Sequence, residues 1–440
     1  SVMRNSLCGL LVAVVAACGA SESTPSGSNP FLDDMEDSGK EDSAYTNPDG
    51  IEIEVDIEGD VTAPDNRMAE APLLVAQYAL TYFRKQEVMY LESLAEDYKS
   101  RGRIEWLIDG AWLTSDQVPE GAVRNRWRLR GVNAVLLFGA ADGVEVGTQF
   151  TARVPISPLS VFNDAGTTCA DDDDHLALTQ PEYWYRWLPD QESCTIPTQN
   201  LSVTVSNKFP TLQSEVYPEY DQLTADNLLS VVVMFGQIGD GALSDWDPGM
   251  YAFKQYGSWL EEAGYAQVTA PLGTRYERTL DNGVTVQIDL YSPYVYAGLN
   301  DYAHFSNFEK GLAEHEIVVW DGHSALGASS AWSRPTYPSW YQIFLYGGCL
   351  GYEYYLKPIF QGKGNSWDKL DIVSSVVEVS ANANRFAAPA IAKIVWAIEH
   401  GGSSSWRDIL ITIRENVGDS TFGASGVRDN CYTPDGSRCQ

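Results

Sequence analysis

The sequence has few basic residues. It holds 29 Lys and Arg against 60 Asp and Glu in 440 residues, a formal net charge of −31. Affinity for nucleic acid depends on neutralising phosphates with cationic side chains, so this balance argues against a nucleic-acid partner. Long apolar runs are scarce, because no segment after residue 20 approaches the ~18 consecutive apolar residues of a membrane span. The composition, 44% hydrophobic and 20% charged, is typical of a globular chain of two or three domains.

Several chemical signatures are also missing. Gly236, Gly239 and Gly241 are spaced wrongly for a dinucleotide fingerprint. Four of the five histidines are scattered without metal-ligand spacing, and no serine stands in a nucleophile-elbow pattern. These absences weigh against dinucleotide binding, a histidine metal centre and a serine hydrolase.

The first residues have the pattern of a targeting segment. Arg4 precedes an uncharged apolar stretch over residues 7–17, and small residues surround Cys18. The run Val15-Ala16-Ala17-Cys18 resembles the bacterial lipobox, in which the chain is cut before the cysteine and the cysteine is lipidated. The resemblance implies a signal peptide over residues 1–17 and membrane attachment only through a lipid on Cys18. The glycine after Cys18 implies an outer-membrane lipoprotein of the bacterial envelope.

Residues 18–50 are rich in Ser, Pro, Gly, Asp and Glu and contain almost no apolar residue. Such a segment buries too little surface to offset its ordering entropy, which predicts a disordered acidic tether. A partner-binding acidic tail is the alternative.

The seven cysteines fit an exported chain in an oxidising compartment. Cys8 lies in the predicted signal peptide, and Cys18 is the predicted lipid acceptor. The expected disulfides are Cys169–Cys194 and Cys431–Cys439. Cys349 is then left without a partner, and an unpaired thiol in an exported protein indicates reactivity.

Residues 51–222 predict a β-rich, sandwich-like N-terminal domain, because alternating and β-branched runs are separated by turn signals. A helix is expected within residues 75–98. The acidic run 171–174 could bind Ca²⁺ through clustered oxygens or form a solvated loop, and the solvated loop is the better-supported interpretation. The aromatic run 183–187 fits core burial better than ligand stacking.

Residues 223–440 predict an α/β domain, because buried strands alternate with helical stretches. The expected strands cover residues 230–235, 316–320, 342–346 and 372–379, and a hairpin covers residues 279–290. Helices are expected over residues 250–263, 308–313 and 384–399. Ser405 and Asp408 have the spacing of a capping box that begins a last helix.

Two of the buried strands lead into chemically reactive side chains. The strand over residues 316–320 runs into Asp321-Gly322-His323-Ser324, and the strand over residues 342–346 runs into Gly347-Gly348-Cys349. Groups beyond the carboxyl ends of neighbouring parallel strands converge where ligands bind. A cysteine beside an imidazole gains thiolate character, and the imidazole can protonate a leaving amine.

These residues resemble the caspase-like cysteine peptidases, a family that includes gingipains, legumains, separases and clostripain. The resemblance covers about residues 225–420 and implies a caspase-like parallel sheet. It implies that Cys349 attacks the scissile carbonyl of a peptide or protein substrate, that His323 acts as general acid and base, and that the backbone amides of Ser324 and Cys349 hold the oxyanion. The family normally has glycine after the histidine, whereas this chain has Ser324.

The loop after the first strand of this domain carries Asp240, Asp245 and Asp247. In caspases the corresponding loop supplies an Arg for an acidic P1 side chain. The acidic loop here therefore predicts a preference for Lys or Arg at P1. Solvated loop carboxylates or a Ca²⁺ site remain alternatives, and no other cofactor is expected.

Two functions therefore follow from the sequence. The first is a lipid-anchored cysteine endopeptidase with a Cys349/His323 dyad. The second is a catalytically inactive caspase-like surface lipoprotein that binds a protein or glycan partner. A free, accessible Cys349 thiol near His323 favours the first function, and a buried or disulfide-bonded Cys349 argues against it.

Overall fold

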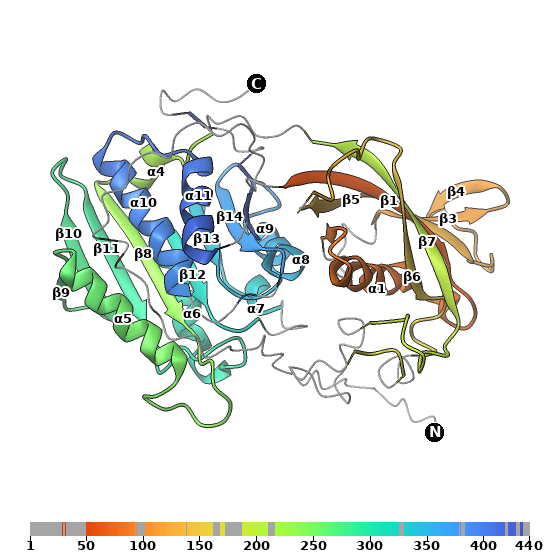
Figure 1. Cartoon of the computed structure of the whole chain (residues 1–440), viewed down its shortest axis with the longest axis horizontal. Helices are drawn as coiled ribbons and strands as arrows, with labels where there is room; N and C mark the ends of the chain where they lie inside the picture. Colours follow the sequence, from red (N-terminus) through yellow and green to blue (C-terminus); the bar gives the residue numbers. More distant parts are fainter. Residues whose placement is uncertain are drawn as a thin grey trace.

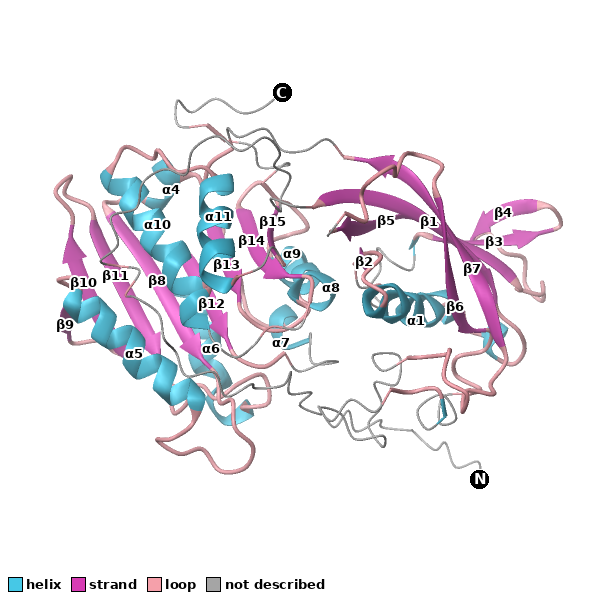
Figure 2. Cartoon of the chain, in the orientation of Figure 1, coloured by secondary structure: helices cyan, strands magenta, loops and turns pink. Residues whose placement is uncertain are grey.

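The structure is a computed structural model, and its described part comprises two β-sheets with their helices (Figures 1 and 2). The last strand of the first sheet ends at Lys208, and the first strand of the second sheet begins at Leu228. The two sheets therefore divide the chain close to the predicted boundary after residue 222. The described residues are 29, 31, 50–92, 94, 102–137, 139–161, 168–171, 187–209, 216–324, 330–377, 379, 383–418, 421–427 and 432–433.

The first sheet is antiparallel, with the strand order β4-β3-β5-β1-β7-β6 and with β2 paired to β5. Its strands are β1 (Ile51–Asp60), β2 (Tyr90–Leu91), β3 (Ile104–Ile108), β4 (Ala111–Thr114), β5 (Arg126–Leu136), β6 (Gln149–Pro155) and β7 (Thr198–Lys208). In β1 the apolar side chains of Ile53, Val55 and Ile57 are buried, and the acidic residues between them lie on the other face. This alternation is the period of two that predicts a half-buried strand.

The helix α1 (Ala71–Lys85) packs against this sheet and buries most of its apolar side chains. The sequence predicts a sandwich here, but among the described residues the strands form one sheet, and α1 takes the place of a second layer. The expected helix within residues 75–98 exists but begins and ends earlier. A helix and a sheet can both cover an apolar sheet face, so alternation in the strands does not distinguish the two.

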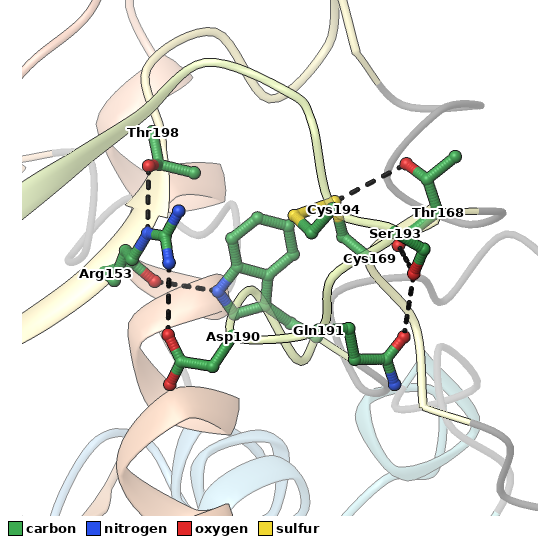
Figure 3. Close-up of a disulfide and its surroundings, with 9 residues drawn as sticks. Arg153, Thr168, Cys169, Asp190, Gln191, Ser193, Cys194 and Thr198 are labelled. Atoms are coloured by element: carbon green, nitrogen blue, oxygen red, sulfur yellow. Dashed lines mark hydrogen bonds and ion pairs between the residues drawn. A yellow bond between two sulfur atoms is a disulfide. The ribbon is translucent and has the colours of Figure 1, made fainter.

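Cys169 and Cys194 form a disulfide, which confirms that predicted pair (Figure 3). Trp187 lies beside it, fully buried, and donates its indole N–H to the carbonyl oxygen of Arg153 at 2.8 Å. Arg153 in turn contacts Asp190 at 3.1 Å. The one described member of the aromatic run 183–187 is therefore a core residue.

The second sheet has the strand order β15-β14-β13-β12-β8-β11-β10-β9. Its strands are β8 (Leu228–Phe235), β9 (Ala266–Val268), β10 (Thr274–Thr279), β11 (Thr285–Tyr291), β12 (Ile317–Asp321), β13 (Gln342–Tyr346), β14 (Leu370–Ser375) and β15 (Phe422–Ser425). The five central strands from β14 to β11 are parallel, and β15 and β10 join the two sides in antiparallel pairing. The α/β class predicted from the alternating elements is confirmed for this part of the chain.

Helices cover both faces of this sheet. One face is packed by α5 (Pro248–Glu262), α10 (Ala387–Glu399) and α11 (Trp406–Val417). The other is packed by α6 (Phe305–Glu314), α7 (Ser330–Ser333) and α9 (Leu356–Gly362). The short helices α4 (Tyr220–Leu223) and α8 (Gly351–Tyr354) complete the described α-helices of this part. Coverage on both faces explains why the central strands are continuous apolar runs.

Local signals predicted the ends of several elements correctly. Ser405 and Asp408 form the predicted capping box at the start of α11. Gly264 has a φ of +85° just after α5, the left-handed conformation expected of a residue that ends a helix. The turn between β10 and β11 lies at residues 280–284, inside the predicted hairpin over residues 279–290, although the first strand of the hairpin begins earlier, at Thr274.

The two sheets share one large core cluster and also meet through a small apolar cluster. Tyr90, Val135 and Leu137 of the first part pack with Tyr352 and Val376 of the second. Because Tyr352 and Val376 follow β13 and β14 closely, the first part of the chain lies against the edge of the α/β domain that carries Cys349.

Candidate functional site

The order of the parallel strands defines where a site is expected. The chain runs from β8 to β11 on one side and then crosses to β12 on the other side of β8. Ligands bind outside the carboxyl ends of strands where the order reverses in this way. A pocket of about 400 Å³ lies at this point. Its lining residues are Gln237, Ile238, Gly239, Asp240, Gly241, Ala297, Gly298, Leu299, Asn300, Asp301, Trp320 and His323.

Asp247 organises the loop after β8. Its carboxylate accepts hydrogen bonds from the amides of Ile238 at 2.9 Å, Gly239 at 2.7 Å and Gly249 at 2.8 Å. It is the N-cap residue of α5 and is buried. The sequence predicts Asp247 as a substrate-binding carboxylate, but its oxygens accept from backbone amides that fix the pocket wall, and it is not among the lining residues described for the pocket. These contacts indicate a structural role, and the substrate-binding role stays a prediction.

His323 lies in the pocket, directly after β12, as the sequence predicts. Its Nε2 donates to the carbonyl oxygen of Ile238 at 2.8 Å. A carbonyl oxygen can only accept, so the proton of a neutral imidazole resides on Nε2 and the lone pair on Nδ1. His323 is thus held by the loop that Asp247 organises.

The loops after β8 and β12 cross closely beneath the pocket. A Cβ on Gly236 would lie 3.2 Å from the Cα of Gly322 and 2.9 Å from the Trp320 ring. A Cβ on Gly322 would lie 3.1 Å from the Cα of Gly236. These two positions therefore need glycine for space, and that close approach brings His323 within reach of Ile238.

Cys349 follows β13, as predicted, but its side chain is closed off. It is 3% exposed, and its sulfur lies 3.2 Å from the amide nitrogen of Val379. Cys349 is also disulfide-bonded, and its partner lies outside the described residues. The expectation of an unpaired Cys349 is therefore wrong. The spacing of cysteines along the sequence does not show which of them forms a disulfide with a cysteine at the end of a distant strand.

The side chains of His323 and Cys349 turn toward different neighbours. His323 contacts Ile238, which follows β8, whereas the Cys349 sulfur contacts Val379, which follows β14. In the sheet, β8 and β14 lie on opposite sides of the β12–β13 pair. The structure thus brings the two loops together at the carboxyl end of the central strands and gives the two reactive groups different contacts.

Ser324 links the two loops. Its hydroxyl donates to the carbonyl oxygen of Cys349 at 2.7 Å and lies 2.9 Å from the Tyr346 hydroxyl. Ser324 is 1% exposed. Its side chain therefore has a structural role, and the predicted oxyanion role of its amide and of the Cys349 amide stays a prediction.

The other two predicted carboxylates remain accessible. Asp240 is exposed on the pocket wall. Asp245 is exposed further along the loop and hydrogen-bonds with Tyr294. Desolvation and then the Asp245 carboxylate raise the pKa of Tyr294. Asp240 is the only one of the three predicted acids among the lining residues described for this pocket.

Sequence reasoning missed the loop after β11. Asp301 and Asn300 from this loop line the pocket. Asp301 accepts from the amide of Ala297 at 2.9 Å and contacts His304 Nδ1 at 2.9 Å. The Oδ1 of Asn300 is buried and has no hydrogen-bond partner among the described residues. The signal was present, since this loop follows a strand that neighbours β8, but β11 was predicted only as part of a hairpin.

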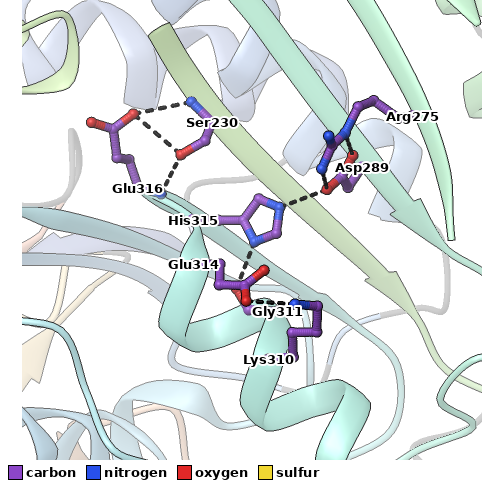
Figure 4. Close-up of polar contacts among 8 residues, drawn as sticks. All are labelled: Ser230, Arg275, Asp289, Lys310, Gly311, Glu314, His315 and Glu316. Atoms are coloured by element: carbon purple, nitrogen blue, oxygen red, sulfur yellow. Dashed lines mark hydrogen bonds and ion pairs between the residues drawn. The ribbon is translucent and has the colours of Figure 1, made fainter. Parts of the chain in front are cut away.

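A second polar cluster lies in the interior of the same domain (Figure 4). Asp289 of β11 accepts two hydrogen bonds from Arg275, at 2.7 and 2.9 Å, and lies 2.8 Å from His315 Nε2. His315 Nδ1 lies 2.7 Å from the carbonyl oxygen of Gly311. Burial acts to raise the pKa of Asp289, but the hydrogen bonds from Arg275 and His315 outweigh it and lower the pKa. With both ring nitrogens facing acceptors, His315 joins β11 to the end of α6 and has a structural role.

Further predictions fall on residues that the structure does not describe. Cys18, Cys431, Cys439 and the signal peptide lie outside the described residues, as do Asp172, Asp173 and Asp174 of the acidic run. Asp171 is paired with Lys85. Within the described ranges, no group of three or more His, Cys, Asp or Glu could hold a metal ion. No helix in the same ranges is long and apolar enough to cross a membrane.

We compared the chain with known protein families, curated proteins and solved structures. No family model, curated protein or solved structure matches the chain.

Proposed function

We propose that the pocket around His323 binds a cationic side chain of a protein or peptide partner. The observation that carries the proposal is the character of its lining: Asp240 contributes an exposed carboxylate, and no Lys or Arg is among the described lining residues. Asp301 also lines the pocket, although its oxygens already contact Ala297 and His304. The buried Oδ1 of Asn300 adds an acceptor that needs a donor. An ammonium or guanidinium group supplies both positive charge and several N–H donors.

The state of Cys349 favours a binding role over catalysis. A nucleophilic cysteine must present a thiolate to its substrate. Cys349 is buried, disulfide-bonded and in contact with Val379 rather than within the pocket lining. The proposed role is therefore the catalytically inactive, caspase-like surface protein, with the partner recognised through its basic side chains.

A caspase-like cysteine peptidase is the second candidate, in a form with Cys349 reduced. Two observations favour it. The Nε2 of His323 is bonded to Ile238, which leaves Nδ1 in the form of a base. Leu350, directly after Cys349, is a fully buried residue with a φ of +53°, and such backbone strain clusters at functional sites. The basic P1 preference predicted from the sequence would use the same pocket.

We place this protein in the bacterial cell envelope because of the lipobox-like run Val15-Ala16-Ala17-Cys18. The disulfide between Cys169 and Cys194 agrees with an oxidising compartment. A lipid on Cys18 would hold the protein at a membrane surface without a membrane-spanning helix.

Calorimetric titration of the full chain with short capped peptides tests the proposed binding. Peptides with a central Arg or Lys are expected to bind, and a matched peptide with citrulline, which has the shape of Arg without its charge, is expected to bind at least fivefold more weakly. Asp240→Asn is expected to weaken Arg-peptide binding about fivefold, the effect of ~1 kcal/mol for an accessible ion pair.

Asp281→Asn is the matched control, because Asp281 is exposed in the β10–β11 turn and outside the pocket lining. Equal binding of the citrulline and Arg peptides, or equal losses from Asp240→Asn and Asp281→Asn, would contradict the proposal. Cleavage of the Arg peptide after reduction, abolished in Cys349→Ala, would favour the second candidate.

A further inference from the structure

Two residues from the predicted tether are packed on the α/β domain. Asn29 is 8% exposed, although it lies in a segment whose composition predicts disorder. Its side-chain amide donates to the carbonyl oxygen of Trp259 at 2.7 Å and to Glu262 Oε2 at 3.3 Å. Both acceptors lie near the end of α5. This contact joins residues 230 and 233 positions apart in the sequence.

The contacts of Asn29 require an amide. Its NH₂ group donates to α5, while its Oδ1 accepts from the backbone N–H of Phe31 at 3.0 Å. An aspartate at this position could still accept from Phe31, but it would set a negative carboxylate against a carbonyl oxygen and Glu262. The carbonyl end of a helix carries partial negative charge, which makes that substitution still less favourable.

Phe31 supplies the apolar part of the contact. Its ring meets the edge of Tyr256 at a centroid distance of 5.4 Å and that of Tyr265 at 6.2 Å. Tyr256 and Tyr265 belong to the core cluster beneath α5, and Phe31 packs against that cluster. Phe31 therefore extends the domain core, because edge-to-face aromatic pairs add to the burial of apolar surface.

We propose that the last turns of α5, with Tyr256 and Tyr265, form a docking site for an Asn-X-Phe segment, and that Asn29 and Phe31 of this chain occupy it. The docked residues belong to the α/β domain, whereas β1, which begins at Ile51, is a central strand of the other sheet. Asn29 and Phe31 are therefore held by one part of the structure, whereas β1, which comes later in the chain, belongs to the other. The docking site lies at the opposite end of α5 from Asp247, so it leaves the His323 pocket open.

Limited chymotrypsin digestion of the full chain, mapped by mass spectrometry, tests this docking. Cleavage after Phe31 requires the ring to leave α5, so it is expected to be slow in the wild-type chain and about tenfold faster in Asn29→Asp at pH 7. The local Asn29–Phe31 turn survives in this variant, so faster cleavage reports loss of docking rather than loss of the turn.

Asn416→Asp is the matched control, because Asn416 also donates to a helix carbonyl, that of Thr412, but lies on the exposed end of α11. It is expected to leave cleavage after Phe31 unchanged. In a second measurement, an excess of a synthetic peptide of residues 26–34 competes for the docking site and accelerates cleavage of the wild-type chain after Phe31. The same peptide with Asn29→Asp does not.

Rapid cleavage after Phe31 in the wild-type chain, or the same slow rate in Asn29→Asp, would overturn the proposal. Acceleration by both peptides alike would overturn it as well, because docking through the Asn29 amide would then be excluded.

Discussion

The loops that follow β12 and β13 both lie at the carboxyl end of the same sheet. The loop after β12 is open, because its His323 lines a pocket, and the loop after β13 is closed, because its Cys349 is buried. The loop after β12 presents His323 to a pocket, where its ring is held by a hydrogen bond to Ile238. The loop after β13 buries Cys349 in a disulfide and against Val379. A strand end therefore fixes where a reactive residue lies, while contacts from distant segments decide whether its side chain is available.

The largest expected effect comes from the support of the open loop. Asp247→Ala removes the acceptor of three backbone amides, including the N-cap contact of α5. Loss of a cap and of further buried hydrogen bonds is expected to lower the free energy of unfolding by about 3 kcal/mol. Chemical denaturation measures this loss, and Asp245→Ala is the control, expected to change it by less than about 0.5 kcal/mol. Equal effects would show that Asp247 does not organise the loop.

Gly348→Ala tests the packing of the closed loop. A Cβ at Gly348 would lie 2.5 Å from the Ser324 hydroxyl oxygen and 2.8 Å from the Tyr346 ring. Overpacking of this kind is expected to lower the free energy of unfolding by about 2 kcal/mol. Asp240→Ala in the loop after β8, on the wall of the open pocket, is the comparison and is expected to be close to neutral in thermal denaturation. A neutral Gly348→Ala would mean that the loop after β13 is as adaptable as the loop after β8.

The smallest expected effect lies at the other end of β12, where Glu316 precedes the strand. Burial raises the pKa of Glu316 from 4.5 to about 7, against the opposing hydrogen bonds from Ser230. Between pH 4.5 and 7 the Glu316 carboxyl therefore keeps its proton in the folded state and loses it in the unfolded state. The stability that the neutral carboxyl contributes is fully present at pH 4 and is lost as the pH rises through 7.

Glu316→Gln replaces that carboxyl with a neutral group of the same shape. It is expected to raise the free energy of unfolding by about 1 kcal/mol at pH 8, after allowance for solvent screening, and to change little at pH 4. Denaturation curves at the two pH values measure the difference. A variant that is destabilised equally at both would show that ionisation of Glu316 does not lower the stability of the folded state.

The sequence was sufficient for the α/β class and for the positions of His323 and Cys349 after neighbouring strands. The signals that predicted these features are local ones. They include the continuous apolar runs of the strands, the capping box at Ser405 and the glycine at position 264 that follows α5. Local contacts dominate at strand interiors and helix ends. The N-cap role of Asp247 could not be predicted, because an N-cap aspartate and a ligand-binding aspartate look the same in a sequence.

Long-range contacts set the limit of prediction. The disulfide of Cys349, the docking of Asn29 on α5 and the contribution of Asn300 to the pocket join segments that are distant in sequence or that follow another strand. The single sheet around α1 was predicted as a sandwich for the same reason, since strand patterns do not identify the layer that covers them.

Alkylation of the full chain with iodoacetamide tests the central claim most directly, with peptide mapping of Cys349 before and after reduction. We expect no labelling of Cys349 in the native, unreduced protein between pH 5 and 9, and labelling once the protein is reduced and unfolded. Selective labelling of native Cys349 near neutral pH, lost in His323→Ala, would contradict it. That result would show an activated thiolate and establish the peptidase as the better account.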